Sequence, residues 1–409
     1  MSTKTEFFDI CAKMFDPTKP FNDLPDLPPP GEIESRAVLK ACIEARAALA
    51  KLNAEARQLP NPDILIRSFA LFEAKDSSEI ENIVTTEDKL FQQSQLRDAD
   101  ADPATKEALR YRDALYSGYR KLGERPVSTR LAIEMCSIIK GYDAEIRRVP
   151  GTTLTNKATG EIIYTPPVGA DLIAAKLANW ERFIHEATDI DPLVRLAVQH
   201  YQFEAIHPFS DGNGRTGRIL NILFLIEEEL LTWPILYLSR ELLETRSAYY
   251  RGLRLVTEGS EWTEWIIYVL NAIRVSAARA EIKIHRISIL REHAAQFLRS
   301  IEPKLVSREL LDILFSQPYC RISDLVDAGI AKRQTASGQL KTIVGAGVLH
   351  EIKIGREKLF LNTKLYELLT SDGEGITEYS RNALKPPSLL FAARNRMALF
   401  AARNRRAPD

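Results

Sequence analysis

The sequence predicts a mainly α-helical protein that contains one internal β-hairpin and a C-terminal winged-helix domain. Three observations favour this fold class. Up to about residue 300, most segments have the apolar spacing of helices, and proline or glycine separates them. The stretch 146–167 is instead rich in β-branched residues on either side of a turn. Beyond residue 304, three short helical patterns precede an alternating hairpin.

The N-terminal and central elements are expected in the following order. The first 31 residues are rich in proline and aspartate and end in PDLPPPG, which indicates an extended arm. A long helix rich in Ala, Leu and Arg should cover 34–59, because Pro60 would stop it. Further helices are expected over 63–75, 106–122, 129–140, 172–186, 193–206, 219–229 and 238–253, and long connecting helices over 262–298.

The C-terminal pattern is typical of a winged helix. Helices are expected over 307–315, 322–326 and 332–344, followed by a hairpin that turns at Gly355. If this domain reads DNA, the third helix and the wing would present Lys332, Arg333, Gln334, Thr335, Ser337, Lys341, Arg356 and Lys358. Such domains also serve as protein-docking or dimerisation modules, and the neutral charge of the chain favours that interpretation.

Composition argues against several classes of protein. The chain holds 55 Lys plus Arg and 55 Asp plus Glu, and a pI near 7.0 argues against broad attraction to nucleic acid or anionic membranes. The longest apolar run, around 219–226, is too short to span a membrane. The four cysteines lack CxxC spacing, so we expect reduced thiols in a cytoplasmic protein: Cys11, Cys42, Cys136 and Cys320. We assign no function to FAARNR, which occurs twice in the basic tail.

The stretch 207–218, HPFSDGNGRTGR, gathers groups that a core or an ordinary turn would not need. Glycines on both sides of Asn213 let the backbone aim its N–H groups at one point, just where a helix should begin, and this forms an anion cradle. Arg215 and Arg218, three residues apart, can grip phosphate oxygens from one side of the first helical turn. Asp211 stands where a divalent cation on the same phosphates needs an oxygen ligand.

His207 adds a reactive group to this cradle. Imidazole is the side chain best matched to taking a proton from a hydroxyl near neutral pH. A single histidine, a GNG turn or a pair of helical arginines would each be ordinary alone, whereas their combination in this order is not. The helical pattern 193–206 leads into the motif, Pro208 ends it, and an apolar helix leads out. The motif therefore predicts a nucleotide site with its own base.

These residues resemble a known family. HPFSDGNGRTGR fits the pattern HPFx[D/E]GNGRxxR of the Fic (filamentation induced by cAMP) proteins at every specified position. The resemblance implies an enzyme that transfers AMP from ATP to a Ser, Thr or Tyr hydroxyl of a target protein, with Mg²⁺ and with release of pyrophosphate. It also implies a role for each motif residue: His207 as base, Asp211 as metal ligand, Gly212, Asn213 and Gly214 at the α- and β-phosphates with help from Arg215, and Arg218 at the γ-phosphate.

A second motif, SSEIEN at 77–82, fits the family's inhibitory pattern [ST]xxxE[GN] through Ser77, Glu81 and Asn82. The resemblance implies that Glu81 pairs with Arg218 in the place meant for the γ-phosphate, which would leave the resting enzyme largely inactive. In some members of the family the same glutamate activates water and removes AMP again.

A simpler explanation of this second motif is local. Ser78 and Glu81 also match the S-x-x-E capping box, which is common at helix starts and needs no regulation to explain it. The match at Asn82 and the downstream motif favour inhibition, so we expect an inhibitory helix over about 77–84.

The hairpin expected in 146–167, with its turn at 156–160, resembles the flap of Fic proteins. The family's flap aligns a target segment by edge pairing, because main-chain bonds fix the register while demanding little of the target sequence. Tyr164, Pro166 and Pro167 resemble the end of that flap. A surface hairpin without function is the alternative.

The stretch 238–253 resembles the family's SR…YY segment, whose aromatic residues contribute to the adenine pocket. Tyr249 and Tyr250 are therefore candidate contacts for the base, and Tyr250 is the better one by family position. Aromatic pairs near a helix end also serve in packing. Some relatives have an asparagine about seven residues further on, where this chain has Thr257, so recognition of the base is open there.

Together these patterns divide the chain into five parts. An N-terminal arm and helical domain, a Fic catalytic core, connecting helices, a winged-helix domain and a tail are expected at 1–100, 101–260, 261–300, 301–365 and 366–409. The inhibitory helix falls in the first part.

The expected function is that of an autoinhibited protein adenylyltransferase. Its partner would be a protein that presents a hydroxyl side chain, or the enzyme itself, and no membrane partner is expected. The alternative is a winged-helix DNA-binding regulator in which the Fic-like site senses a nucleotide. His207 argues against this alternative, because a sensor has little use for a base. In some relatives another phosphate-containing donor replaces ATP, and a homodimer is common among them.

Overall fold

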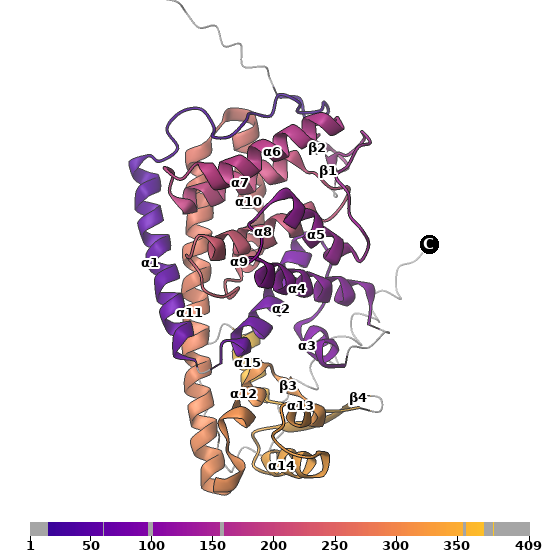
Figure 1. Cartoon of the computed structure of the whole chain (residues 1–409), viewed down its shortest axis with the longest axis vertical. Coiled ribbons are helices and arrows are strands. Elements are labelled where there is room, and N and C mark those ends of the chain that lie inside the picture. The colour runs from indigo at the N-terminus through magenta and orange to yellow at the C-terminus, as the bar shows by residue number, and fades with distance from the viewer. Residues whose placement is uncertain are drawn as a thin grey trace, which may run out of the picture. The chain divides into compact units, whose positions relative to one another are not determined.

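The computed structural model describes residues 15–59, 61–96, 101–155, 159–354, 357–371 and 379. The chain forms two compact units, Met1–Ser288 and Ile289–Asp409. Helices make up most of the described residues in each unit (Figure 1), which confirms the mainly α-helical fold class. Some expected features lie outside the described residues: Cys11, the hairpin turn at 156–158, the wing turn at Gly355 and Arg356, and the repeated FAARNR.

The first unit is built of helices and one hairpin. Its helices are α1 (Arg36–Gln58), α2 (Asp63–Ile80), α3 (Glu87–Leu96), α4 (Pro103–Lys121), α5 (Thr129–Lys140), α6 (Ala170–Glu186), α7 (Pro192–Ile206), α8 (Asn213–Glu227), α9 (Leu238–Glu244), α10 (Arg246–Gly259) and the first part of α11 (Trp262–Ile301). Helix α3 has no counterpart among the expected helices. The segment 238–253 belongs to two helices that meet at Thr245, and 262–298 lies in one helix rather than several.

Local sequence signals explain where several of these helices begin and end. Asp191 caps α7 by accepting a hydrogen bond from the Leu193 N–H (2.8 Å), and Pro192 is the first helical residue. Ser128 caps α5 in the same way. Gly141 ends α5 in the left-handed conformation, with φ of 74°, which glycine adopts without steric cost.

The helices α7 and α8 form the centre of the first unit. α7 packs against α6 and α8, and α8 also contacts α4 and α5. Nearly every residue of both helices is buried, including polar and charged side chains such as Arg195, Gln199 and Arg218. Trp180 Nε1 donates to the Gln199 carbonyl oxygen (3.1 Å), and Trp265 Nε1 donates to that of Ala197 (2.7 Å). The turn between α7 and α8 is thus held by two buried helices.

The hairpin and the N-terminal arm lie against each other. The strands β1 (Leu154–Thr155) and β2 (Ile162–Tyr164) are antiparallel, with Leu154 opposite Tyr164. The described arm residues before α1 form no helix or strand, and the Phe21 N–H donates to the Thr165 carbonyl oxygen just after β2 (2.9 Å). The Asn179 side chain exchanges two hydrogen bonds with the Leu27 backbone (2.8 and 2.9 Å). The arm therefore braces the base of the hairpin.

The second unit combines short helices with a small sheet. After the end of α11 it contains η1 (Pro303–Leu305), α12 (Arg308–Ser316), β3 (Tyr319–Cys320), α13 (Ile322–Asp327), α14 (Arg333–Gly345), β4 (His350–Ile354), β5 (Glu357–Leu361) and α15 (Thr363–Thr370). The antiparallel sheet has the order β3–β5–β4. Three helices followed by a β-hairpin occur in the expected order, whereas β3 and α15 have no expected counterpart. Leu310, Leu314, Leu340, Ile343 and Phe360 are buried in this unit.

The described cysteines are buried free thiols: Cys42, Cys136 and Cys320. Burial raises the pKa of Cys42 to about 12 and that of Cys136 to about 11, so both thiols stay protonated at neutral pH. No helix within the described ranges is both long enough and apolar enough to cross a membrane.

Candidate active site

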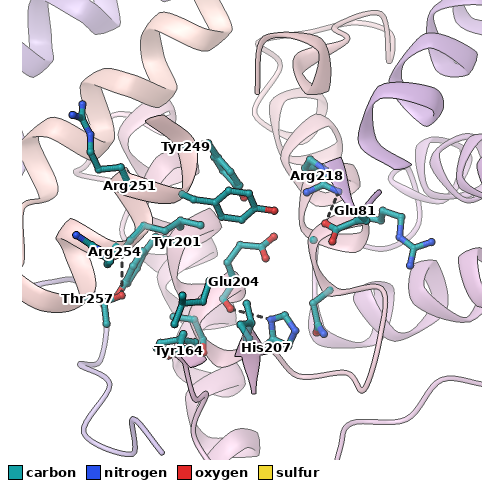
Figure 2. Close-up of a pocket in the computed structure, with 18 of the residues that line it drawn as sticks. Glu81, Tyr164, Tyr201, Glu204, His207, Arg218, Tyr249, Arg251, Arg254 and Thr257 are labelled. Carbon is teal, nitrogen blue, oxygen red and sulfur yellow. Dashed lines mark hydrogen bonds and ion pairs between the residues drawn. The ribbon is translucent and has the colours of Figure 1, made fainter. Parts of the chain in front are cut away.

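The HPFSDGNGRTGR segment forms the turn from α7 into α8 and lines a pocket of about 480 Å³, a size typical of ligand sites. Most predicted site residues line this pocket: Glu81, Tyr164, His207, Asp211, Gly212, Asn213, Gly214, Arg215, Arg218, Tyr249 and Tyr250. In Figure 2, Glu81 and Arg218 lie on one side of the pocket and Tyr249 on the other, with His207 below them. Ser77, Pro166 and Pro167 do not line it.

His207 is held in a constrained position at the end of α7. It is the C-cap residue, with φ of 50°, a left-handed conformation that is uncommon outside glycine. Its Nδ1 lies 3.3 Å from the carbonyl oxygen of Glu204, which can only accept a hydrogen bond, so Nδ1 carries the hydrogen and Nε2 does not. Burial lowers the pKa of His207 to about 4, although the hydrogen bond to Glu204 opposes this shift. The imidazole is therefore neutral near pH 7.

Arg147 falls within the stretch expected to form the hairpin but was given no role there, and it holds the backbone around His207. Its buried guanidinium donates from Nε to the His207 carbonyl oxygen (2.8 Å) and from Nη2 to those of Ile206 (3.1 Å) and Pro167 (2.5 Å). Because Pro167 follows β2, one side chain joins the base of the hairpin to the motif turn. No sequence signal identifies this role, since the acceptors are main-chain atoms of distant residues.

The first turn of α8 forms the expected cradle. Gly212 precedes the helix with φ of 88°, and the first N–H groups of a helix lack partners within it. The Asn213 side chain is occupied inside the turn, where it accepts from the Phe209 N–H (2.7 Å) and donates to the Phe209 carbonyl oxygen (2.8 Å). Asn213 therefore shapes the turn with its side chain, and only its backbone N–H is left for a ligand.

Arg215 and Asp211 belong to a network of four charged side chains. Arg215 pairs with Glu107 and with Asp211 (3.2 Å), and Lys140 pairs with Asp211 (2.5 Å) and Glu107 (3.2 Å). Burial would raise the pKa of Asp211, but the hydrogen bond from Lys140 and the charge of Arg215 outweigh it and lower that pKa. Asp211 is therefore ionised, and its side chain is 57% exposed. Glu107 and Lys140 come from α4 and α5 and lie outside the predicted motifs.

The expected pair between Glu81 and Arg218 is present, and Ser77 joins it. Arg218 Nη2 donates to Glu81 Oε1 (3.0 Å) and to the Ser77 carbonyl oxygen (2.9 Å), while Nε donates to Ser77 Oγ (2.8 Å). Burial would raise the pKa of Glu81 and lower that of Arg218, but their mutual attraction outweighs burial and shifts each pKa the other way. A Cβ atom at Gly214 would collide with Glu81 Oε1, so this carboxylate lies directly against the first turn of α8.

The SSEIEN stretch ends a helix rather than starting one. α2 runs to Ile80, Glu81 is its C-cap, and Asn82 follows with φ of 64°. Glycine and asparagine tolerate this left-handed conformation best, which gives a physical reason for an E-[GN] ending. The capping-box interpretation of Ser78 and Glu81 is therefore wrong. The expected inhibitory helix at about 77–84 is in fact the last turn of α2 and the residues after it.

The side chains at the end of the hairpin are engaged inside the protein. Tyr164 Oη donates to the Ala205 carbonyl oxygen (2.8 Å), and the Tyr164 ring stacks on Phe15 with centroids 6.2 Å apart. Pro166 and Pro167 are buried. Tyr164 therefore ties the end of the hairpin to the last turn of α7.

The two candidate tyrosines differ in exposure. Tyr249 is only 2% exposed, and its hydroxyl forms a hydrogen bond with His200 Nε2 (3.0 Å). Tyr250 is 37% exposed, and its ring meets Tyr249 edge-on at 5.2 Å. Thr257 also lines the pocket, and its hydroxyl forms a hydrogen bond with the Tyr201 hydroxyl (2.9 Å). Tyr250 is thus the more accessible surface for a base, whereas Tyr249 supports it from the core.

The pocket suits a cation that is bound partly by a protein carboxylate and partly by the phosphates of a ligand. Among the residues that the structure describes, no three His, Cys, Asp or Glu side chains gather to hold a metal ion. Asp211 nevertheless offers an ionised and exposed carboxylate at the pocket wall. Mg²⁺ is usually bound through one or two carboxylates together with substrate phosphates and waters, and the Asp211 carboxylate fits this mode of coordination.

Three family models match consecutive parts of the chain. A model of the Fic/DOC family N-terminal region matches residues 39–120, and one of the Fic/DOC family matches 126–225. A model described as the C-terminal domain of SoFic-like protein adenylyltransferases matches 290–365. The second match contains the motif turn and its cradle, and the three together span more than half of the sequence. The chain belongs to the Fic/DOC family.

Curated relatives are similar over a shorter stretch. Protein adenylyltransferase fic-1 of Caenorhabditis briggsae is 28% identical over 146 residues, which are 35% of this chain and 26% of that protein. Probable protein adenylyltransferase aq_aa38 of Aquifex aeolicus (strain VF5) is 38% identical over 95 residues, which are 23% of this chain and 26% of that protein. The aligned part thus spans about a quarter of the length of these relatives.

A solved structure supports the fold. The crystal structure of a Fic family protein from Desulfovibrio desulfuricans G20 superposes with a TM-score of 0.52 at 19% identity. The superposition covers 85% of this chain and 99% of that chain. The two proteins therefore share a fold over most of their length.

Proposed function

We propose that this protein is an adenylyltransferase that transfers AMP from ATP to a hydroxyl side chain of a protein. The observation that carries the proposal is the meeting of a neutral imidazole, His207, with the anion cradle of α8 and Arg218 in one pocket. A phosphate cradle alone would suit a sensor, whereas a base beside it suits transfer. The similar proteins named protein adenylyltransferases support the same reaction.

The proposed reaction displaces pyrophosphate from the α-phosphorus of ATP. A Ser, Thr or Tyr hydroxyl of the target attacks this phosphorus and gives its proton to His207 Nε2. The new P–O bond forms as the bond to the β-phosphate oxygen breaks, which leaves AMP on the protein and pyrophosphate in the cradle. The hydrogen bond from Nδ1 to the Glu204 carbonyl oxygen keeps Nε2 free to accept the proton.

Positive charge and oriented N–H groups would stabilise the transferring phosphates. The backbone N–H groups at the start of α8 would hold the α- and β-phosphates, and Arg218 would hold the γ-phosphate. Asp211, together with phosphate oxygens, would hold Mg²⁺, which would neutralise charge on the departing pyrophosphate. Arg215 already contacts Asp211 and would add positive charge at the same place.

We also propose that Glu81 keeps the resting enzyme inactive. Its carboxylate pairs with Arg218 and lies against Gly214, so it would compete with the γ-phosphate for one guanidinium. The Arg218 side chain is 1% exposed, and an ion pair at such a position is costly to break. Productive binding of ATP therefore requires that Glu81 withdraw.

Labelling with ATP tests both roles. Wild type, Glu81→Gly and Glu81→Gly/His207→Ala would each be incubated with Mg²⁺ and α-labelled ATP, alone and with cell extract as a source of targets. We expect Glu81→Gly to gain about tenfold or more in protein-bound label, the factor that corresponds to about 1.4 kcal/mol, and the double variant to lose it. For the purified protein alone, labelling with γ-labelled ATP should remain at background, because the γ-phosphate leaves as part of pyrophosphate. Equal α-labelling of all three forms would overturn both assignments.

Removal of AMP is a second reaction that this site would support. The ionised carboxylate of Glu81 and the neutral His207 line the same pocket. Glu81 would activate a water that attacks the phosphorus of the modified side chain, and the products are AMP and the free hydroxyl. Protein labelled by the Glu81→Gly variant should release labelled AMP when wild type is added without ATP. Release at the same rate with added Glu81→Gly would contradict this reaction.

The alternative function, a DNA-binding regulator, would depend on a winged-helix role for the second unit. Lys332, Arg333 and Lys341 are exposed at or within α14 and are the cations that such a role would use. Fluorescence titration of the full chain with duplex DNA tests it. We expect only weak, salt-sensitive binding, because the chain is neutral overall. Tight, sequence-specific binding that His207→Ala leaves unchanged would favour the alternative.

A further inference from the structure

An acidic side chain in the pocket has no part in the reaction proposed above. Glu204 lies in the last turn of α7, three residues before His207, and lines the same pocket. Its Oε1 is buried and accepts no hydrogen bond from any residue that the structure describes. A buried carboxylate oxygen without a donor disfavours the folded state unless a ligand supplies the missing bond.

Packing keeps this carboxylate in the pocket. A Cβ atom at Gly217 would lie 2.6 Å from Glu204 Oε1 and 3.2 Å from the ring of Phe203. Gly217 lies inside α8, where glycine weakens a helix and its φ needs no glycine. The space above Gly217 is therefore taken by Glu204, and the two residues fit only as a pair.

Glu204 lies between the two ends of the pocket. On one side it interacts electrostatically with Arg218 and Glu81, and on the other with Tyr249 and Tyr250. Figure 2 shows its carboxylate in the middle, between the Glu81–Arg218 pair and Tyr249. If ATP places its γ-phosphate at Arg218 and its base at Tyr250, Glu204 faces the part of the ligand that joins them.

Because a carboxylate is an anion that accepts hydrogen bonds, only some groups of a nucleotide can bind next to Glu204. The phosphates of a nucleotide carry negative charge and no donor, so they would avoid Glu204. The ribose, which joins the phosphates to the base, carries two hydroxyl donors. We propose that Glu204 accepts a hydrogen bond from a ribose hydroxyl of the bound nucleotide and makes the site selective for ribonucleotides over deoxyribonucleotides. This inference rests on the proposed function in taking ATP as the ligand.

Binding measurements on a form that cannot turn over test the proposal. The parent is Glu81→Gly/His207→Ala, and calorimetry would give Kd values for ATP, 2′-deoxy-ATP and 3′-deoxy-ATP with Mg²⁺. We expect the parent to bind ATP about tenfold or more tightly than one of the two analogues, as sites that hydrogen-bond a hydroxyl do. Adding Glu204→Ala should bring that ratio within about twofold, and Glu204→Gln, which keeps one acceptor, should retain part of it.

Matched variants separate a contact from a general disturbance. Glu186→Ala removes an exposed carboxylate at the end of α6, outside this pocket, and should leave the ratio unchanged. Gly217→Ala should also lower the ratio, because it displaces Glu204 without altering it. This second variant gives the answer if Glu204→Ala does not fold.

The acid–base behaviour of the pocket provides a further readout. Burial raises the pKa of Glu204 to about 7, although Arg218 opposes the shift, and Glu81 adds to it. In the parent, loss of Glu81 moves the pKa of Glu204 down from that value, Arg218 stays charged, and Tyr249 and Tyr250 stay neutral between pH 6 and 8. The ionised carboxylate is the better acceptor, so the preference for ATP should grow as pH rises from 6 to 8 and should not change in Glu204→Ala.

Each failure has its own meaning. Tight binding of all three nucleotides by the parent with equal Kd, or a ratio that survives Glu204→Ala, would overturn the role of Glu204 and leave the transferase proposal intact. Absence of ATP binding by the parent, together with absence of label on Glu81→Gly, would overturn the proposed function and with it this inference.

Discussion

At the scale of single residues, the state of His207 is set by its neighbours. Burial withdraws water from the imidazolium and lowers its pKa to about 4, and the Glu204 carbonyl oxygen holds the hydrogen on Nδ1. A base works only when unprotonated, so its function is present above that pKa and is lost as the pH falls through it. His207 is therefore unprotonated at any pH from mildly acidic to basic, as a base must be before the reaction.

The pH dependence of the rate checks this statement. For Glu81→Gly at saturating ATP, the initial rate of AMP transfer should stay within about twofold from pH 8 to pH 5.5 and should fall only toward pH 4, where His207 becomes protonated. Circular dichroism at each pH would confirm that the protein is folded. A decline centred near pH 6.5, the ordinary pKa of histidine, would contradict the burial argument.

Lys140 offers a second residue-scale prediction. It holds Asp211 at 2.5 Å and thus competes with any cation for this carboxylate. Lys140→Met should lower the Mg²⁺ concentration that gives half-maximal transfer by about threefold or more, because a neighbouring positive charge is lost. Lys121→Met is the matched control, since Lys121 pairs with Glu134 away from the pocket. An unchanged or raised Mg²⁺ requirement in Lys140→Met would refute the competition.

Residues of the site were predictable where one short segment contains them. The motif turn includes its own backbone signal, which is why His207 and Arg218 were candidates, whereas Glu81 was a candidate only through the resemblance of SSEIEN to the family pattern. Glu107 and Arg147 could not be found in this way, because they act through contacts that the packing of α4 and the hairpin creates. Glu204 had only a weak signal, because α7 contains several other polar side chains, among them Arg195, Gln199 and His200.

At the scale of elements, α2 presents one face to the site. Glu73, Ser77 and Glu81 are spaced by four residues and so lie on one side of the helix. Glu73 accepts from the Ser239 N–H (2.9 Å) and from Tyr111 Oη (3.1 Å), which anchors the helix in the core. Ser77 and Glu81 then reach Arg218 from the helix end. The contact of Glu81 with Arg218 thus depends on where α2 stops.

Asn82 tests this dependence on the helix end. Asn82 has a φ of 64°, a left-handed conformation that glycine and asparagine tolerate best. Other residues lose about 1–2 kcal/mol of folding stability there, and β-branched residues lose the most. Asn82→Gly should unfold in urea like wild type, within about 0.5 kcal/mol, since glycine accepts this conformation. Asn82→Val should lose about 1–2 kcal/mol and should gain labelling with α-labelled ATP, because Glu81 is no longer held in place. Equal stability and equal labelling of the two variants would contradict this account.

The predicted helix boundaries are correct where capping residues and apolar periodicity agree, as at α5, which has its expected bounds. The predicted boundaries are wrong where tertiary contacts determine the end of a helix. The segment 238–253 has one helical pattern, yet α9 and α10 are separate helices. Helix α3 was missed because its ten residues are mostly polar and charged, which hides its short buried side.

At the scale of the whole molecule, the candidate site lies within the first unit alone. Ligand binding stabilises the state that binds, by about 2.7 kcal/mol at a concentration of 100 Kd. Hydrogen exchange of the full-length Glu81→Gly variant should therefore show ATP-dependent protection in α7, α8 and α10, and none in α12 to α15. Wild type should show much less protection at the same ATP concentration. Equal protection in both forms would contradict a blocked site.

The fold class was predictable because it depends on apolar patterns that repeat along the whole chain. If the hairpin edge pairs with a target as proposed, it recognises main-chain atoms and places few demands on the target sequence, so this chain predicts no particular target. Of the three residues predicted to contact a target, Tyr164 donates a hydrogen bond to the Ala205 carbonyl oxygen, and Pro166 and Pro167 are buried, so their role toward a target stays a prediction.

The most direct test of the central claim is a crystal structure of Glu81→Gly/His207→Ala with ATP and Mg²⁺. The account predicts the γ-phosphate at the Arg218 guanidinium, the α- and β-phosphates over the first turn of α8, and the α-phosphorus open toward the position of the His207 side chain. Triphosphate bound away from Arg218, or an α-phosphorus turned from residue 207, would contradict it.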